Sequence, residues 1–234
     1  MKNKTQLFCF TYAGGNTSFF DEIEAELPGI ELVKIEYAGH GERHKEPFYN
    51  DFNELSIDLY NVFMRSYQGG DYAFFGYSMG SISMVEVLRQ VLKSGIQNPT
   101  HVFLSAHEPH TKSELLGFKR DELDEWVKER TIEFGAVPER LIDNKVFWRT
   151  YLPMYRADYT IIGKYDFDSL DLKTEIPATI FYSEKDTPYV EIKKWDRFFT
   201  GLNDYHGFEG GHFFIKEHYK EMADIIRNRL GTVL

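Results

Sequence analysis

A serine flanked by two glycines is the first candidate for chemistry in this 234-residue chain. Ser78 is the centre of G-Y-S-M-G at residues 76–80, which follows the apolar run 72–75 and precedes the helical pattern 82–88. In a tight turn between a strand and a helix, a Cβ at either glycine would strike neighbouring backbone, and the serine would be strained. The pattern favours a nucleophilic serine held above a sheet edge; the alternative is an incidental serine in a glycine-rich turn.

A serine hydroxyl needs a base and an orienting acid to act as a nucleophile near neutral pH. Asp186 follows the apolar run 178–182, and His212 lies in a glycine-flanked loop before the last helical pattern. We expect His212 to take the serine proton and return it to the leaving group. We expect Asp186 to hold the imidazole tautomer, with Glu184 as the alternative acid.

The oxygen that becomes negative during such an attack needs N–H donors. The backbone N–H of Met79, at the start of the helix after the serine, would be one. The loop Y-A-G-G at residues 12–15 follows the first strand pattern and would supply the second. Ala13 is the first candidate there and Gly14 the next; the alternative is that this loop is only a tight turn.

Strand and helix patterns alternate along the chain. This arrangement can bring Ser78, Asp186 and His212 to one edge of a sheet. Buried strand patterns cover residues 6–11, 30–36, 72–75, 101–105, 178–182 and, weakly, 204–208. The helical patterns between and after them include residues 55–63, capped by Asn50 or Asp51, residues 82–94, ended by Gly95, and residues 216–230. This order predicts an α/β fold: a mostly parallel sheet with helices on both faces. In such a sheet the ligand binds at the carboxyl ends of the strands, where the serine, aspartate and histidine all fall.

The strand signal disappears between about residues 111 and 158. Helical spacing is present instead, first over residues 123–134, closed by Gly135, and then over residues 145–155. We therefore expect a single domain over residues 1–234 with a helical lid insertion at about 111–158.

The expected lid carries apolar side chains that either cover an acyl chain or pack the lid onto the domain: Leu115, Leu116, Phe118 and Trp126. Because substrate must enter past the lid, we expect faster hydrogen exchange or higher B-factors there than in the sheet.

The composition excludes several classes of function. A formal net charge of −10 argues against binding to nucleic acid or to an anionic membrane surface. No stretch of about 18 apolar residues is present, so no membrane span is expected. The single cysteine, Cys9, lies in a strand pattern and fits a reducing compartment as a buried, inert thiol. We expect a cytoplasmic protein, most simply a monomer.

The remaining histidines do not form a metal site in sequence. The sequence H-E-P-H at residues 107–110 places two histidines and one acid around a proline, without the helical spacing of metal sites. We expect no metal and no cofactor. His206 falls in a strand pattern, and His40 lies in a loop that could approach the site, although both are most simply structural.

Four segments together resemble one protein family. They are the loop segment F-C-F-T-Y-A-G-G at residues 8–15, the serine turn at 76–80, L-P-M-Y-R-A-D-Y at 152–159 and G-G-H-F-F at 210–214. They are similar to the motifs of the external, type II thioesterases of nonribosomal peptide and polyketide synthases, which have the α/β-hydrolase fold and are close to medium-chain fatty acyl thioesterases. The resemblance spans nearly the whole chain, and the R-A-D and G-G-H-F-F segments are the more specific.

The resemblance implies Ser78, Asp186 and His212 as a catalytic triad, with Met79 and Ala13 as oxyanion donors. It implies hydrolysis of acyl thioesters on the phosphopantetheine arm of an acyl or peptidyl carrier protein, for editing or release. A small-molecule carboxylesterase, a medium-chain fatty acyl thioesterase and a non-catalytic binding protein remain the alternatives.

One loop departs from the family pattern, and the net charge does not match the expected partner. The loop after the second strand reads A-G-H-G-E-R at residues 38–43 where the family usually has P-G-R, which leaves the role of Arg43 open. Carrier proteins are typically acidic, so docking would need a local basic patch. Lys112, Lys119 and Arg120 are candidates, although a solvated face is the simpler interpretation.

Overall fold

The computed structural model describes residues 4–110 and 117–231. Its strands are β1 (Thr5–Phe10), β2 (Ile30–Ile35), β3 (Tyr72–Tyr77), β4 (His101–Ser105), β5 (Ala178–Tyr182) and β6 (Asn203–Gly207). They form one sheet in the order β2-β1-β3-β4-β5-β6, and every neighbouring pair is parallel. The expected α/β fold with a parallel sheet is confirmed.

The helices are α1 (Asp21–Ala25), α2 (Phe52–Ser66), α3 (Met79–Ser94), α4 (Arg120–Glu133), α5 (Lys145–Lys164), α6 (Tyr189–Ile192) and α7 (Ile215–Arg229). Several of their ends were predicted from sequence. The side chain of Asp51 accepts a hydrogen bond from the Glu54 N–H and caps α2, and Gly95 ends α3 in the left-handed conformation (φ 76°).

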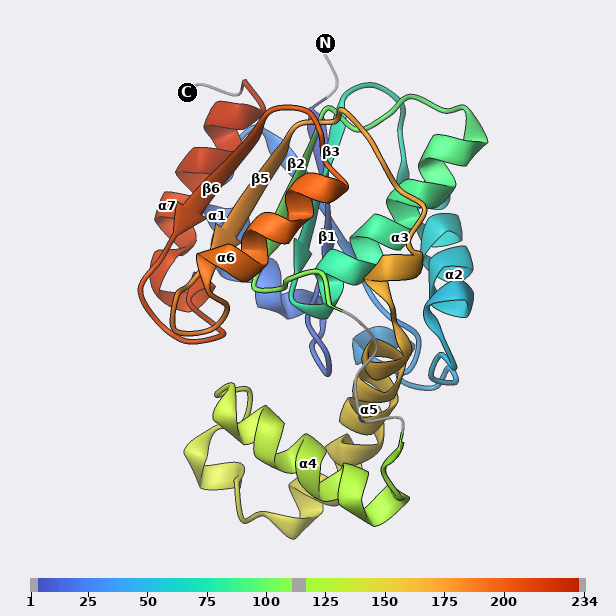
Figure 1. The fold of residues 1–234 in the computed structure, drawn as a ribbon, viewed down its shortest axis with the longest axis vertical. Helices are drawn as coiled ribbons and strands as arrows, with labels where there is room; N and C mark the ends of the chain where they lie inside the picture. The colour runs from blue at the N-terminus through green and yellow to red at the C-terminus, as the bar shows by residue number, and fades with distance from the viewer. Residues whose placement is uncertain (1–3, 111–116, 232–234) are drawn as a thin grey trace.

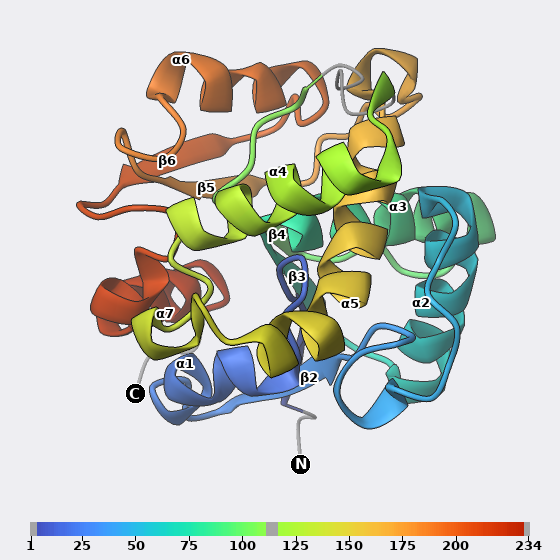
Figure 2. The same ribbon diagram turned by 90° about the horizontal axis from the view of Figure 1, so that it is seen from below.

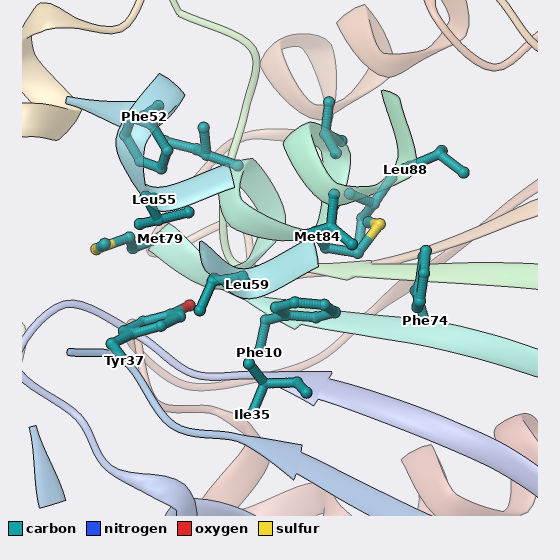
Figure 3. Packing of buried hydrophobic residues seen from close by; sticks show 14 of the residues in the cluster. Phe10, Ile35, Tyr37, Phe52, Leu55, Leu59, Phe74, Met79, Met84 and Leu88 are labelled. Atoms are coloured by element: carbon teal, nitrogen blue, oxygen red, sulfur yellow. The ribbon is translucent and has the colours of Figure 1, made fainter. Parts of the chain in front are cut away.

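Alternating residues of β1 enter two separate cores, as the two-residue period of a strand requires. Phe8 and Phe10 pack against α2 and α3, and this core continues to Trp195 beyond α6. Figure 3 shows the part of this core that lies between the sheet and the helices α2 and α3. Leu7 and Cys9 pack on the opposite face with residues of α1 and α7. Helices therefore cover both faces of the sheet (Figure 1).

The helices α4 and α5 lie beyond one end of the sheet rather than on a face (Figure 1). Figure 2, seen from below, shows both helices across that end. We call residues 117–164 the α4–α5 segment. It occupies the stretch in which the strand signal disappears.

The end of α5 differs from the sequence expectation. The predicted helix stopped at residue 155, whereas α5 continues to Lys164 and contains Pro153 in its first half. The β-branched residues 160–162 lower the intrinsic helix propensity there. Burial of Asp158, Tyr159 and Ile161 accompanies the continuation, so tertiary packing overrides the local preference.

Candidate active site

The serine lies in a strained turn, as its flanking glycines predict. Ser78 has φ 55° and ψ −122°, a conformation that is rare for a residue with a side chain. A Cβ on Gly76 would lie 2.4 Å from the carbonyl oxygen of Gly80, and a Cβ on Gly80 would lie 2.0 Å from that of Phe10. The predicted steric reason for both glycines is confirmed: one lets α3 approach its own strand and the other lets α3 approach β1.

Three residues far apart in sequence form a hydrogen-bonded chain at the carboxyl ends of the strands. The Oγ of Ser78 lies 2.9 Å from Nε2 of His212, and Nδ1 of His212 lies 2.9 Å from Oδ1 of Asp186. A carboxylate accepts only, so Nδ1 carries the proton and Nε2 accepts from the serine hydroxyl. All three side chains are at least nine-tenths buried.

The structure distinguishes the two candidate acids. Glu184 accepts a hydrogen bond from the Tyr189 N–H at the start of α6, 3.2 Å away, and so serves the local turn. Asp186 is the acid that faces the imidazole. The N–H groups of Asp186 and Thr187 donate to the Ser183 carbonyl and brace the loop. The hydroxyl of Ser183 donates to the Gly210 carbonyl, 2.5 Å away. The acid loop and the histidine loop are thereby tied to each other.

Two further residues contact His212: Tyr77 in the serine turn and Phe134 at the end of α4. The hydroxyl of Tyr77 donates to the carbonyl of His212, 2.6 Å away. The ring of Phe134, at the end of α4, stacks on the imidazole with ring centroids 3.9 Å apart and planes 16° apart. Arg130 in turn lies over the far side of Phe134, 4.0 Å from its centroid. The sequence placed Phe134 at helical spacing and gave no indication of its position on the imidazole, which only the fold supplies.

The loop after β1 offers one free candidate for the second oxyanion donor. The N–H of Gly14 donates to Oδ2 of Asp158 at 2.7 Å and is occupied by that bond. Ala13 lines the same cavity as Ser78, which leaves its N–H as the better candidate of the two. Met79 is the first residue of α3, where an N–H has no acceptor within the helix.

A cavity of about 420 Å³ opens at the serine and extends beneath the α4–α5 segment. Aromatic and aliphatic side chains from that segment line it: Trp126, Phe134, Tyr159 and Ile162. Of the apolar residues expected to cover an acyl chain, Trp126 lines the cavity and packs edge-on against Tyr159. Phe118 is 40% exposed, and Leu115 and Leu116 lie outside the described residues.

The side chains of the R-A-D segment bind other loops and helices rather than the serine. Arg156 donates to Oδ1 of Asp124 at 2.6 Å and ties α5 to α4, while Asp158 holds the loop after β1. The Arg43 side chain binds Glu46, Asp58 and the Glu36 carbonyl, so its role is to brace its own loop. Lys119 and Arg120 are exposed, and Lys112 lies outside the described residues.

The other histidines are not part of the hydrogen-bonded chain from Ser78 to Asp186. His110 donates to the Ile162 carbonyl, and burial together with the neighbouring histidines holds the pKa of His107 well below its usual range. Burial lowers the pKa of His101 to about 4, consistent with a neutral ring bound to Thr179. His206 approaches Asp204 within β6. Within residues 4–110 and 117–231, no group of three or more His, Cys, Asp or Glu side chains could hold a metal ion.

Two further expectations concern the molecule as a whole. Cys9 is fully buried, and burial raises the pKa of its thiol far above the usual value, which makes it inert. Among the helices that the structure describes, none has the length and apolar character needed to cross a bilayer.

Comparison with known proteins identifies the family. Residues 5–230 match the thioesterase domain model. The chain is 29% identical to the medium-chain S-acyl fatty acid synthase thioesterase of Rattus norvegicus, over 98% of this chain and 88% of the relative. It is 26% identical to the gramicidin S biosynthesis protein GrsT of Aneurinibacillus migulanus, over 99% of this chain and 91% of that protein.

Solved structures agree with the sequence relatives. The crystal structure of ClbQ from the colibactin pathway superposes with a TM-score of 0.87 at 25% identity, covering 98% of both chains. The type II thioesterase BorB of the borrelidin cluster gives 0.82 at 26% identity, covering 98% of this chain and 94% of that one. The chain therefore belongs to the thioesterase domain family and is an enzyme of α/β-hydrolase fold, with homologues among the type II thioesterases of nonribosomal peptide and polyketide clusters.

Proposed function

We propose that the protein is a serine thioesterase that removes acyl groups from the phosphopantetheine arm of carrier proteins, for editing or release in nonribosomal peptide or polyketide synthesis. The observation that carries the proposal is the hydrogen-bonded chain from Ser78 through His212 to Asp186, open to a partly apolar cavity. The names of GrsT and BorB support the carrier-bound substrate.

The first half of the reaction forms an acyl-enzyme. Oγ of Ser78 attacks the thioester carbonyl carbon while Nε2 of His212 takes the hydroxyl proton. Asp186 stabilises the imidazolium, and the N–H groups of Met79 and Ala13 bind the oxygen that becomes negative. The carbon–sulfur bond then breaks, and His212 gives its proton to the departing pantetheine sulfur.

The second half returns the enzyme to its starting state. A water molecule attacks the ester carbonyl of acyl-Ser78, with His212 as the base. The carbon–oxygen bond to Ser78 breaks, the serine recovers its proton from the imidazolium, and the carboxylic acid leaves. The residues of the α4–α5 segment would act as the lid that keeps bulk water from the cavity during these steps.

A panel of acyl groups loaded on carrier proteins, compared with free p-nitrophenyl esters of the same acids, tests the proposal. We expect Ser78→Ala to fold normally and to lose carrier-thioester hydrolysis by at least about 10³-fold. Ser18→Ala, at an exposed serine, is the matched control and should retain wild-type activity. Full activity of Ser78→Ala would refute the mechanism.

The same panel separates the other candidate functions. A medium-chain fatty acyl thioesterase is the second candidate, favoured by the likeness to the rat enzyme. It would prefer acyl chains of intermediate length over aminoacyl and peptidyl groups. A strong preference for free esters would indicate a carboxylesterase. Failure of Ser78 to react with a fluorophosphonate probe would indicate a binding protein without catalytic activity.

A further inference from the structure

A buried ionisable pair lies beside the loop after β1, outside the triad. His40, in the loop between β2 and α2, is 1% exposed, and Asp158, on α5, is 2% exposed. Nε2 of His40 and Oδ2 of Asp158 are 2.9 Å apart. Buried ionisable side chains are costly unless they are paired, so the pair needs an explanation.

The hydrogen bonds of His40 define its protonation state. Nδ1 lies 3.0 Å from the Ala38 carbonyl and Nε2 lies 2.9 Å from the Asp158 carboxylate. With Asp158 as a carboxylate, both neighbours are acceptors, so both ring nitrogens donate and the ring is an imidazolium.

The charges around the ring agree with this state. Burial alone lowers the pKa of His40, but Asp158 from α5, the Ala38 carbonyl and Glu36 at the end of β2 outweigh it and raise the pKa above 6.5. The ring of Tyr37 packs edge-on against the imidazole, and burial keeps the pKa of that phenol far above its usual value. Tyr37 therefore stays neutral in the pH range in which His40 titrates.

Asp158 connects this pair to the loop after β1. Its Oδ2 accepts both the His40 proton and the N–H of Gly14, the latter at 2.7 Å. Gly14 has φ +75°, and a Cβ there would lie 2.0 Å from the ring of Tyr155, one turn before Asp158 on α5. The loop is thus held by one ring and one carboxylate from successive turns of the same helix.

We infer that the His40–Asp158 pair positions the oxyanion-hole loop, so that both residues are positioning residues for the hydrolysis. The inference rests on the proposed function, in which the N–H of Ala13 binds the oxyanion. The bond from Gly14 to Asp158 holds the Ala13–Gly14 peptide, which adjoins the Tyr12–Ala13 peptide that carries the Ala13 N–H. The charge on His40 supplies a counter-ion that holds the Asp158 carboxylate in place. Without that charge the buried carboxylate would have no counter-ion, and the single N–H left on the ring would have to serve either Asp158 or the Ala38 carbonyl.

The inference has a definite pH dependence. A histidine whose pKa is raised in the folded protein holds its proton at low pH and loses it as the pH rises through the folded value. The loop is therefore held below that pH and loosened above it. We expect kcat to fall on the alkaline side by roughly tenfold, a part of the 10² to 10³ that loss of one oxyanion donor costs, with little change in KM.

Two variants and a matched control test the positioning role by kinetics on a free p-nitrophenyl ester. His40→Gln keeps one donor but no charge, and we expect a kcat roughly tenfold lower at neutral pH and no alkaline fall. Asp158→Asn should lower kcat by about 10- to 100-fold. His44→Gln, at an exposed histidine of the same loop, should behave as wild type. An unchanged alkaline fall in His40→Gln would overturn the inference.

A measurement without substrate separates this inference from the proposed function. In protein labelled with 15N-glycine, the Gly14 amide resonance should shift with pH in the wild type and in His44→Gln, but not in His40→Gln. A Gly14 resonance that is insensitive to pH in the wild type overturns the inference whatever the activity. A Gly14 shift in an enzyme that hydrolyses no carrier thioester would contradict only the proposed substrate.

Discussion

The two walls of the active-site cavity are built differently. The sheet side is set by α3, which buries eleven of its sixteen residues, and by glycines that leave no room for a Cβ. On the opposite side, α4 buries two of its fourteen residues, Val127 and Thr131. Ser78 thus stands on densely packed backbone, whereas α4 buries fewer groups and is tied to α5 by the partly buried ion pair of Arg156 with Asp124. From this difference in packing we expect the serine side to be rigid and α4 to be the more adaptable wall.

The largest expected effect concerns the acid on the sheet side. Asp186→Asn preserves shape but lets the side chain donate, which favours the wrong imidazole tautomer, and we expect kcat to fall by roughly 10⁴-fold. Glu184→Gln, two residues away, should leave kcat close to wild type because Glu184 faces the α6 turn. Measuring kcat of both variants and of the wild type on one p-nitrophenyl ester tests this prediction. Similar losses in the two variants would contradict the assignment of the acid.

The next comparison is between a buried glycine of α3 and an exposed glycine just before α4. Gly80→Ala would place a Cβ 2.0 Å from the Phe10 carbonyl oxygen, with backbone on both sides, and should destabilise the fold by at least about 3 kcal/mol. At Gly117, which is exposed, a Cβ would have no neighbour within 4 Å among the residues that the structure describes, so Gly117→Ala should change stability by less than about 0.5 kcal/mol. Urea midpoints measure both. Equal stability of the two variants would show that the serine turn at residues 76–80 tolerates movement of α3.

The smallest effect requires no substitution. If α4 is the adaptable wall, its amides should exchange with an opening free energy at least about 2 kcal/mol below that of α3 and the central strands. Hydrogen exchange followed by mass spectrometry resolves the two helices. Uniform protection across α3 and α4 would count against a lid that opens for substrate.

Much of the sheet side of the cavity was predictable, because the sequence patterns that specify it are local. The glycines around Ser78 are required by steric contacts of one turn, and alternating strands and helices place loop residues at the carboxyl ends of a parallel sheet. Asp186 and His212 were found from chain order and position alone. The choice of Asp186 over Glu184 required coordinates, since two residues in one loop differ in direction and not in composition.

The α4–α5 wall was less predictable because its contacts are long-range. The position of Phe134 on the imidazole and of Trp126 in the cavity depends on how two helices cross the end of the sheet. The continuation of α5 past residue 155 depends on burial that outweighs weak helix formers. Helical periodicity in the sequence predicts neither the positions of these two side chains nor the length of α5.

The sequence by itself determined the fold class and placed Ser78, His212 and either Asp186 or Glu184 at the strand ends, because strand and helix periodicity and glycine sterics are properties of short segments. Only the tertiary structure decided which acid faces His212, and that Gly14 is engaged by Asp158 while Ala13 lines the cavity beside Ser78. The same holds for the charge on His40, a residue the sequence marked only as structural or near the site. Its protonation follows from two acceptors that meet the ring from its own loop and from α5, 118 residues away.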